Sequence, residues 1–132
     1  DEVSSISLSS DGRRAATGSH DTTAKIWDLS GKDPSTWRLE RVLESHTSYV
    51  LSISLSGDGR RTATGSDDLT AKIWDVVGED PSTWRLLRTL QDHTDEVSSI
   101  SLSSDGRRAA TGSKDGTAKI WDSSGEDPST WR

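Results

Sequence analysis

Serine, histidine and aspartate, the residue types of a hydrolytic triad, recur in all parts of the chain. Together they could carry out acyl transfer, with serine as the nucleophile and histidine as the base. The trio recurs in successive copies, however, whereas a catalytic triad is normally built once, and no nucleophile elbow surrounds these serines. We therefore expect a chain that is not an enzyme and keep a hydrolase as a distant alternative.

Metal binding is the second chemistry that histidine could provide. The chain has three histidines and no cysteine, so thiolate catalysis and zinc–cysteine sites are excluded. His20 stands beside Asp21 and is the one histidine for which a ligand role is worth weighing. A single His-Asp pair is short of the three or four ligands that a zinc site requires. We expect neither a metal nor a cofactor.

The charge balance argues against two classes of partner. Sixteen Lys and Arg residues stand against 22 Asp and Glu residues, which gives a net charge of -6. This balance repels phosphate backbones and anionic lipids, so we expect no nucleic acid and no membrane as partners. The lack of cysteine suits a reducing compartment, and we expect a cytoplasmic protein. The recurring arginine pairs are expected to form a solvated face: Arg13-Arg14, Arg60-Arg61 and Arg107-Arg108.

Three copies of one unit account for the whole sequence. The period is 47 residues, as Trp27, Trp74 and Trp121 show, and the units span residues 1–47, 48–94 and 95–132. Over their 38 shared positions the first and third copies differ at four, which indicates either recent duplication or a designed consensus. The third copy lacks a counterpart of residues 39–47. Because the sequence starts at Asp1 and contains no Met, we expect a processed, trimmed or excised chain.

Each unit reads as short strands separated by turns. In the first unit, strands are predicted over residues 3–8, 15–19 and 23–28, with a tight turn at Asp11-Gly12 and a loop over 29–36. Residues 37–43 are ambiguous, because Leu39, Val42 and Leu43 also have helical spacing. A strand fits better, since a fourth antiparallel neighbour covers the edge that the third strand leaves open.

One tryptophan per unit recurs in the sequence Asp-Pro-Ser-Thr-Trp-Arg, at Trp37, Trp84 and Trp131. These side chains could form an aromatic recognition ring. A tryptophan at the start of an outer strand more often packs against the loop before it. We favour this structural role.

A Trp-Asp pair closes the third predicted strand of every copy, as Trp27-Asp28, Trp74-Asp75 and Trp121-Asp122. His46 and His93 stand where WD-repeat proteins carry a Gly-His dipeptide, with the glycine replaced. In these features the chain resembles the WD-repeat family over essentially its whole length. The resemblance implies an all-β fold, a β-propeller of four-stranded antiparallel blades. It further implies three blades per chain, the third lacking its outer strand.

The resemblance also implies a hydrogen-bonded tetrad in each blade. A histidine ahead of the first strand joins an aspartate, a Ser or Thr hydroxyl and the Trp of the Trp-Asp pair. The indole N–H can donate to the hydroxyl, the hydroxyl to the imidazole, and the other imidazole N–H to the carboxylate. The implied residues are His46, Thr64, Asp68 and Trp74 in the second blade, His93, Thr111, Asp115 and Trp121 in the third, and Thr17, Asp21 and Trp27, without a histidine, in the first.

Positions where the copies differ in chemistry are candidates for a binding site. In the family that the chain resembles, residues before the first strand and beside the turn aspartate lie on one rim of the disc, where partners dock. Tyr49 is the best anchor, because interfaces favour amphipathic aromatic side chains. Drift at unconstrained surface sites explains the differences equally well. The candidate rim consists of Glu2, Tyr49, Glu96, His20, Asp67, Lys114, Thr22, Leu69 and Gly116.

Three blades do not make a closed ring, because propellers have about 4–8. We expect closure either by further blades or by self-association, as a homodimer of six blades or a homotrimer of nine, and favour the trimer. The leading functional hypothesis is thus a scaffold for protein–protein interaction that closes into a ring. The rival is a designed or excised propeller fragment without a ligand.

Overall fold

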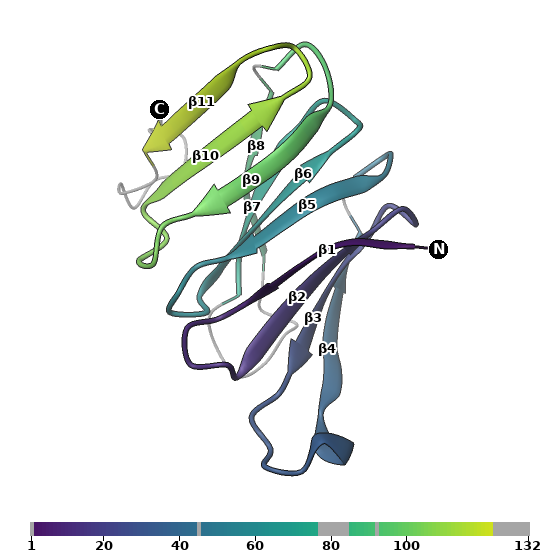
Figure 1. The fold of residues 1–132 in the computed structure, drawn as a ribbon, viewed down its shortest axis with the longest axis vertical. Helices are drawn as coiled ribbons and strands as arrows, with labels where there is room; N and C mark the ends of the chain where they lie inside the picture. Colours follow the sequence, from purple (N-terminus) through teal and green to yellow (C-terminus); the bar gives the residue numbers. More distant parts are fainter. Residues whose placement is uncertain (1, 45, 77–84, 92, 123–132) are drawn as a thin grey trace.

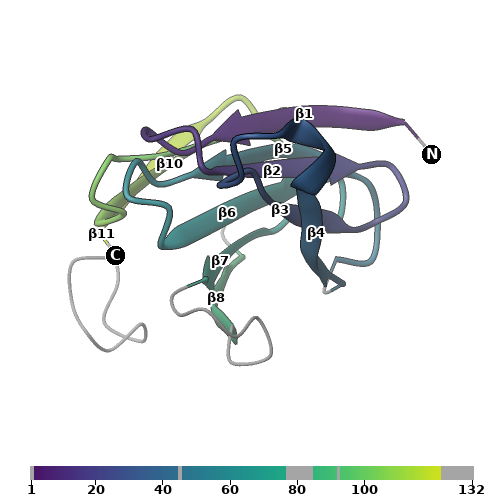
Figure 2. The same cartoon turned by 90° about the horizontal axis from the view of Figure 1, so that it is seen from below.

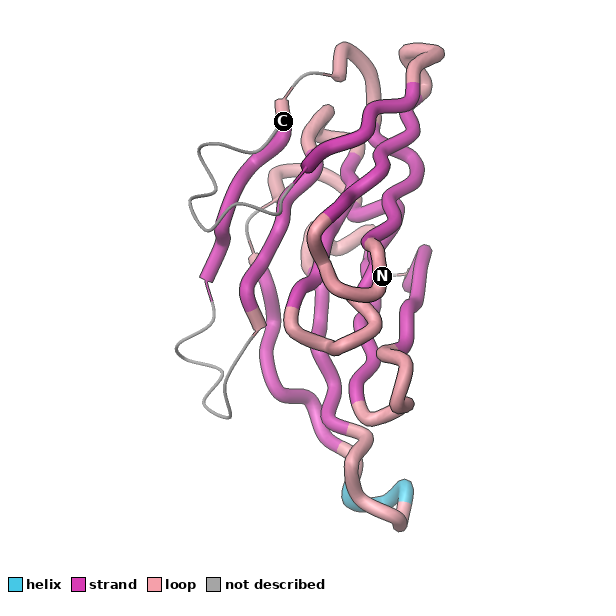
Figure 3. Tube along the Cα trace, turned by 90° about the vertical axis from the view of Figure 1, so that its left-hand side faces the viewer, coloured by secondary structure: helices cyan, strands magenta, loops and turns pink. Residues whose placement is uncertain are grey.

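The structure is a computed structural model that describes residues 2–44, 46–76, 85–91 and 93–122. Eleven β-strands and one short 3-10 helix account for its regular elements. The strands are β1 (Val3–Leu8), β2 (Arg14–Ser19), β3 (Ala24–Asp28), β4 (Arg38–Leu43), β5 (Val50–Leu55), β6 (Arg61–Ser66), β7 (Ala71–Asp75), β8 (Arg85–Leu90), β9 (Val97–Leu102), β10 (Arg108–Ser113) and β11 (Ala118–Asp122), and the 3-10 helix is η1 (Pro34–Thr36). Figure 3 shows η1 as the only helical turn in the described part of the chain.

The strands form three antiparallel sheets, one from each copy of the repeat. Their strand orders are β1-β2-β3-β4, β5-β6-β7-β8 and β11-β10-β9. The sheets lie one after another along the molecule, with the second between the first and the third (Figure 1). The predicted all-β fold is confirmed, with two four-stranded blades and a third blade of three strands in the described part of the chain.

The ambiguous segment before each inter-blade connection is a strand. β4 pairs with β3 in a register that places Leu43 opposite Ala24 and Val42 opposite Lys25. Leu43 is buried while Arg38 and Leu39 are exposed. Leu39, Val42 and Leu43 therefore lie in a strand in spite of their helical spacing, because pairing with β3 satisfies the backbone groups of this segment.

The hydrophobic core lies between the sheets, where small side chains allow close stacking. In each core, one sheet packs face to face against the next sheet along the chain. We call the face of the earlier sheet its rear face and the face of the later sheet its front face. Between the first and second sheets it contains Ala16, Ala24, Ile26, Leu43, Ile53, Leu55, Trp74 and Val76. Between the second and third it contains Ala63, Ala71, Ile73, Leu90, Val97, Ile100, Leu102, Ala109 and Trp121, with Leu87 packed against it.

Serines connect the first strands of neighbouring blades. β1 and β5 run together on the side of the molecule away from β8 (Figure 2). The backbone N–H of Ile53 donates to Ser5 Oγ at 3.2 Å, and that of Leu55 to Ser7 Oγ at 3.0 Å. The backbone N–H groups of Ile100 and Leu102 donate to the hydroxyl oxygens of serines in β5 in the same way. The serine-rich strands thus satisfy edge amides that no neighbouring backbone reaches.

One buried hydroxyl gives a first prediction. Thr62 Oγ1 is fully buried and has no hydrogen-bond partner among the described residues, and the other copies have Ala15 and Ala109 at this position. Replacing the hydroxyl with a methyl group removes a desolvation penalty at constant volume, so Thr62→Val should raise the free energy of unfolding by about 1 kcal/mol. Thr64→Val, two residues away, removes a hydrogen-bonded hydroxyl and should lower the free energy of unfolding. Denaturant unfolding of both variants checks the pair, and a loss of stability in Thr62→Val contradicts the prediction.

Candidate functional site

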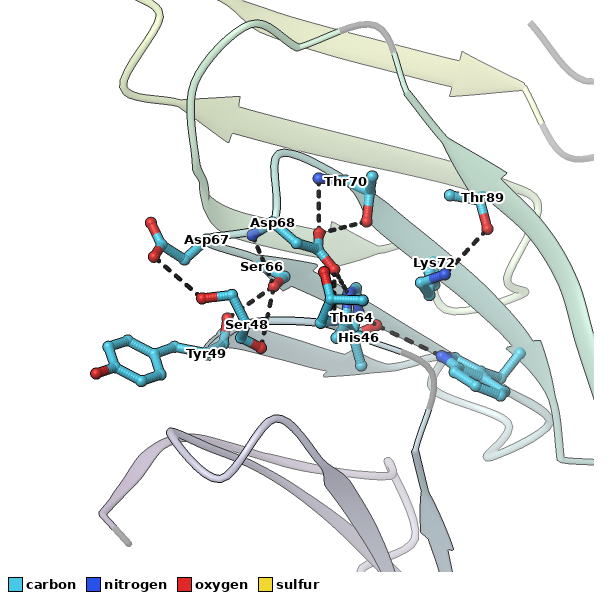
Figure 4. A network of polar contacts seen from close by, with 12 residues as sticks. His46, Ser48, Tyr49, Thr64, Ser66, Asp67, Asp68, Thr70, Lys72 and Thr89 are labelled. Carbon is cyan, nitrogen blue, oxygen red and sulfur yellow. Dashed lines mark hydrogen bonds and ion pairs between the residues drawn. The ribbon is translucent and has the colours of Figure 1, made fainter.

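The second blade brings together the four residues of its implied tetrad. His46 follows β4, Thr64 lies in β6, Asp68 in the turn after β6, and Trp74 in β7. His46 Nδ1 lies 2.8 Å from Asp68 Oδ2, and His46 Nε2 contacts Thr64 Oγ1. The Trp74 indole N–H donates to the same hydroxyl at 3.4 Å. Figure 4 shows the chain of contacts crossing from the connection between blades into the second sheet.

The hydrogen-bond pattern assigns the proton of His46. Thr64 Oγ1 accepts from the indole, so its own proton is available for His46 Nε2, and Nδ1–H then donates to Asp68. Burial lowers the pKa of His46, against the raising effect of Asp68, which favours this neutral form. Burial would raise the pKa of Asp68, but hydrogen bonds from Thr70 and His46 outweigh it and lower the pKa. The site therefore holds a neutral imidazole against an ionised carboxylate.

The third blade repeats this arrangement. His93 Nδ1 lies 2.9 Å from Asp115 Oδ2, His93 Nε2 lies 2.7 Å from Thr111 Oγ1, and the Trp121 indole N–H donates to Thr111 at 3.2 Å. The pKa of Asp115 is lowered, chiefly by the hydrogen bond from Thr117. The backbone N–H of the residue after the histidine also donates to the aspartate, in both blades.

The first blade has the threonine, the aspartate and the tryptophan of the tetrad, and no histidine precedes its first strand within residues 1–132. Trp27 donates to Thr17 Oγ1 at 3.2 Å, and Asp21 Oδ1 accepts from the N–H and the hydroxyl of Thr23. Thr17 and Trp27 are half-buried, whereas their counterparts in the other two blades are buried. The pKa of Asp21 is lowered, chiefly by the Thr23 hydroxyl.

These geometries decide what the Thr-His-Asp groups can do chemically. The Thr64 side chain is fully buried between Trp74 and His46, so a substrate carbonyl cannot reach its oxygen. The same holds for Thr111, which is 1% exposed. The arrangement can fix the connection between two blades, because breaking a link strands a buried polar group at about 1–3 kcal/mol.

The lowered pKa of His46 has a consequence for stability. Because its folded pKa lies below the unfolded value, the unfolded chain binds the proton first as the pH falls through about 6.5. The free energy of unfolding should therefore fall below that pH, by at most about 1.4 kcal/mol per pH unit for this group. Urea titrations of the wild type and His46→Gln between about pH 7.5 and 5.5 test this. Equal pH dependence in the two chains would contradict it.

Six of the nine candidate rim residues lie in pairs, one residue just before the first strand of a blade and the other just after its second strand. The backbone N–H groups of His20, Asp67 and Lys114 donate to the carbonyls of Glu2, Tyr49 and Glu96, in that order. His20 stacks on Tyr49 of the next blade, with ring centroids 4.4 Å apart and an interplanar angle of 9°.

Side-chain contacts also link rim residues: His20 Nε2 lies 3.1 Å from Glu2 Oε1, and Lys114 Nζ forms an ion pair with Glu96 Oε1 at 2.7 Å. Tyr49 and Asp67 point away from the His46 network (Figure 4), and Tyr49 remains exposed. In the described ranges no three His, Asp or Glu side chains gather into a group that could hold a metal ion.

The last three rim positions share an unusual backbone conformation. Thr22 and Leu69 have φ of 77°, and Gly116 has φ of 87°, all in the left-handed region. A residue with a Cβ is strained there by about 1–2 kcal/mol, whereas glycine is not. Part of this advantage of glycine is lost, because glycine gives up more conformational entropy on folding. The difference between the copies is therefore a difference in turn strain.

This strain gives a matched pair of substitutions. Leu69→Gly should raise the free energy of unfolding by about 0.5–1 kcal/mol, and Gly116→Leu should lower it by a similar amount. No heavy atom lies within 4 Å of a Cβ built on Gly116, so the second change tests backbone conformation and not packing. Thermal unfolding of both variants provides the measurement. A Gly116→Leu chain as stable as the wild type would contradict the account.

Two expectations about exposed residues have different outcomes. The arginine pairs are not a fully solvated face, because Arg14 Nη1 donates to Gly59 O at 3.0 Å and Val76 O at 2.8 Å, and Arg61 Nη1 to Gly106 O at 3.0 Å. The second arginine of the first two pairs thus joins neighbouring blades.

The Trp37 indole N–H donates to Gly31 O at 2.8 Å, within the loop before it. Trp84 and Trp131 lie outside the described residues.

Sequence comparison places these blades in a known family. The sequence model described as WD domain, G-beta repeat matches residues 1–28, 37–75 and 84–122. Each match ends at a Trp-Asp pair, and the second begins just before β4, so it contains a full tetrad from His46 to Trp74. A search of curated proteins found no match. No helix in the described part of the chain is long and apolar enough to cross a membrane. With more than half of its residues matched and three blades of the expected strand order, the chain belongs to the WD-repeat family of β-propeller proteins.

Proposed function

We propose that the chain is a non-catalytic scaffold for protein–protein interaction that closes into a ring with copies of itself. The observation that carries the proposal is that its two terminal sheet faces are copies of the two sides of the internal blade interface. A chain that exposes both sides of an interface it also forms internally can bind its own kind head to tail.

The first sheet exposes the front side of this interface. Val3, Ile6 and Leu8 of β1 correspond to Val50, Ile53 and Leu55 of β5. Ile6 is 66% exposed, whereas Ile53 is 4% exposed against the first blade. An apolar row of this kind, which its own repeat buries elsewhere in the chain, marks an association surface.

The third sheet exposes the rear side. Ile120 is 67% exposed, whereas its counterparts Ile26 and Ile73 are buried by the next blade. Ser99 and Ser101, equivalent to the serines that accept edge amides from a following strand, are also exposed. They match the amides of Ile6 and Leu8, to which no described residue offers a serine.

Repetition of this interface by three chains gives nine blades and by two chains gives six. We favour the trimer. The absolute mass in solution, measured by light scattering over a range of concentrations, tests ring closure. A mass of three chains supports the trimer and a mass of two the smaller ring. A chain that stays monomeric at all concentrations overturns self-association.

The rim that carries Tyr49 is proposed as the docking surface for another protein. Support comes from the exposed aromatic side chain of Tyr49, stacked on His20, between acidic and basic neighbours that vary from blade to blade. Substituting Tyr49, Asp67 and Lys114 together should abolish capture of a partner from source lysate. An unchanged pull-down would exclude this surface. A cytoplasmic location stays a prediction.

A further inference from the structure

Two of the three blades place a nitrogen base against a carboxylate of their own at the rim. The two groups come from the residue before the first strand and the residue after the second strand. In the first blade, His20 Nε2 lies 3.1 Å from Glu2 Oε1. In the third blade, Lys114 Nζ lies 2.7 Å from Glu96 Oε1. The carboxylate of each of these blades thus has a basic partner within the same blade.

The second blade has the carboxylate without the base. Tyr49 and Asp67 occupy the two positions there, and the backbone N–H of Asp67 donates to Tyr49 O at 3.0 Å. Asp67 Oδ2 accepts a hydrogen bond from Ser48 Oγ at 3.2 Å, and no described residue donates to Asp67 Oδ1. The side chains of Tyr49 and Asp67 both point outward, away from His46 (Figure 4). A carboxylate with a free acceptor atom therefore lies beside an aromatic ring.

The ring of Tyr49 has one open face. His20 of the first blade stacks on the other face, with ring centroids 4.4 Å apart and an interplanar angle of 9°. Tyr49 is nevertheless 48% exposed, so the exposed area belongs to the edge of the ring and to the face opposite His20. Because the stack holds the ring in place, the open face is a preorganised platform, and the face of an aromatic ring attracts cations.

The charges around this platform also favour a cation. The candidate rim carries the carboxylates of Glu2, Asp67 and Glu96 against the single ammonium group of Lys114. The pKa of Lys114 is raised, chiefly by the hydrogen bond to Glu96 and further by the charges of Asp95 and Asp67. The carboxylates of the second and third blades thus act together as one negative field. Such a field attracts basic segments of a partner and repels acidic ones.

We propose that the rim of the second blade receives an arginine side chain of a partner protein, with the guanidinium group on the open face of Tyr49 and an N–H group donating to Asp67 Oδ1. The arginine supplies the base that this blade lacks, as Lys114 does for Glu96 in the third blade. Arginine fits better than lysine, because a planar guanidinium group stacks on the ring while its N–H groups donate to a carboxylate. The inference rests on the docking surface proposed above and names the chemistry of its partner.

Two peptides that differ in charge test the inference: acetyl-Gly-Gly-Arg-Gly-Gly-amide, and the same peptide with citrulline, which keeps the planar shape and loses the positive charge. Tyr49 is the only tyrosine of the chain, so its ring resonances report on the site in NMR titrations of the full chain. We expect the arginine peptide to shift these resonances and to bind about tenfold more tightly than the citrulline peptide. Equal affinities, or no shift with either peptide at millimolar concentrations, overturn the inference.

A matched pair of substitutions separates contact with Asp67 from the general negative charge of the rim. Asp67→Asn keeps the size of the side chain and removes its charge, so it should weaken binding of the arginine peptide at least about threefold. Asp95→Asn removes the same charge from the same rim and leaves Tyr49 and Asp67 in place, so the affinity should stay within about twofold. Equal losses in the two variants would show that the carboxylate of Asp67 does not hold the arginine.

Capture of a partner from source lysate distinguishes this inference from the docking surface on which it rests. If the triple substitution of Tyr49, Asp67 and Lys114 abolishes capture while the two peptides bind equally, the arginine site alone is refuted. If the arginine peptide binds more tightly and capture is unchanged, the docking surface alone is refuted.

Discussion

An Ile6→Glu chain is expected to stay folded but lose self-association, whereas an Ile53→Glu chain is expected to unfold. The two residues occupy the same position in successive blades, so the chemistry of the change is identical. Ile53 is buried in the core between the first and second sheets, while Ile6 is exposed at the end of the array. Burying a carboxylate without a partner costs several kcal/mol, close to the total stability of many domains.

Circular dichroism and light scattering distinguish the two outcomes. Ile53→Glu should lose its cooperative unfolding transition, or lose on the order of 4 kcal/mol of stability. Ile6→Glu should keep the wild-type spectrum and have the mass of one chain. If Ile6→Glu has the same oligomer mass as the wild type, the exposed row of β1 is not part of an association surface.

Repetition in the sequence made most of the fold predictable. Hydrophobic alternation and turn residues predicted the first three strands of each blade to within about two residues, because each strand buries one face. The fourth strand was ambiguous, since Leu39, Val42 and Leu43 suit either a helix or a strand. Only its pairing with β3, a tertiary contact, decides between them.

Contacts between blades could not be predicted in the same way. Nothing in a serine-rich strand indicates that Ser5 and Ser7 accept amides from the next blade, although the Ser-x-Ser pattern recurs in every copy. Arg14 looked solvated because its carbonyl partners, Gly59 and Val76, are more than forty residues away. Such contacts depend on how two sheets stack.

For the candidate site, too, the sequence predicted some features and not others. The residues of the tetrads were named through the family resemblance, and the structure adds their distances, burial and proton positions. The rim was inferred from differences between copies. At Thr22, Leu69 and Gly116 that signal has a backbone cause, a left-handed turn, which a comparison of side-chain chemistry does not reveal.

The glycine of the second strand of each blade provides the sharpest test of how blades meet. A Cβ on Gly65 would lie 2.8 Å from Val97 Cγ1 and 3.1 Å from Val97 O in the next blade. A backbone oxygen cannot rotate away, so Gly65→Ala should lower the free energy of unfolding by about 1–3 kcal/mol. At Gly112, the same position in the third blade, the nearest atom is Ser99 Cβ at 3.7 Å, an ordinary contact.

Gly112→Ala should therefore have the opposite effect on the single chain, raising its stability by about 0.5–1 kcal/mol, because alanine is favoured over glycine in a strand. In the closed ring Val3 of the next copy would meet the new methyl group, so the same substitution should weaken assembly at least about tenfold. Urea unfolding in an Ile6→Glu background measures the first effect, and light scattering of the single variant measures the second. If Gly112→Ala assembles as tightly as the wild type, the terminal faces do not meet in the geometry of the internal interface.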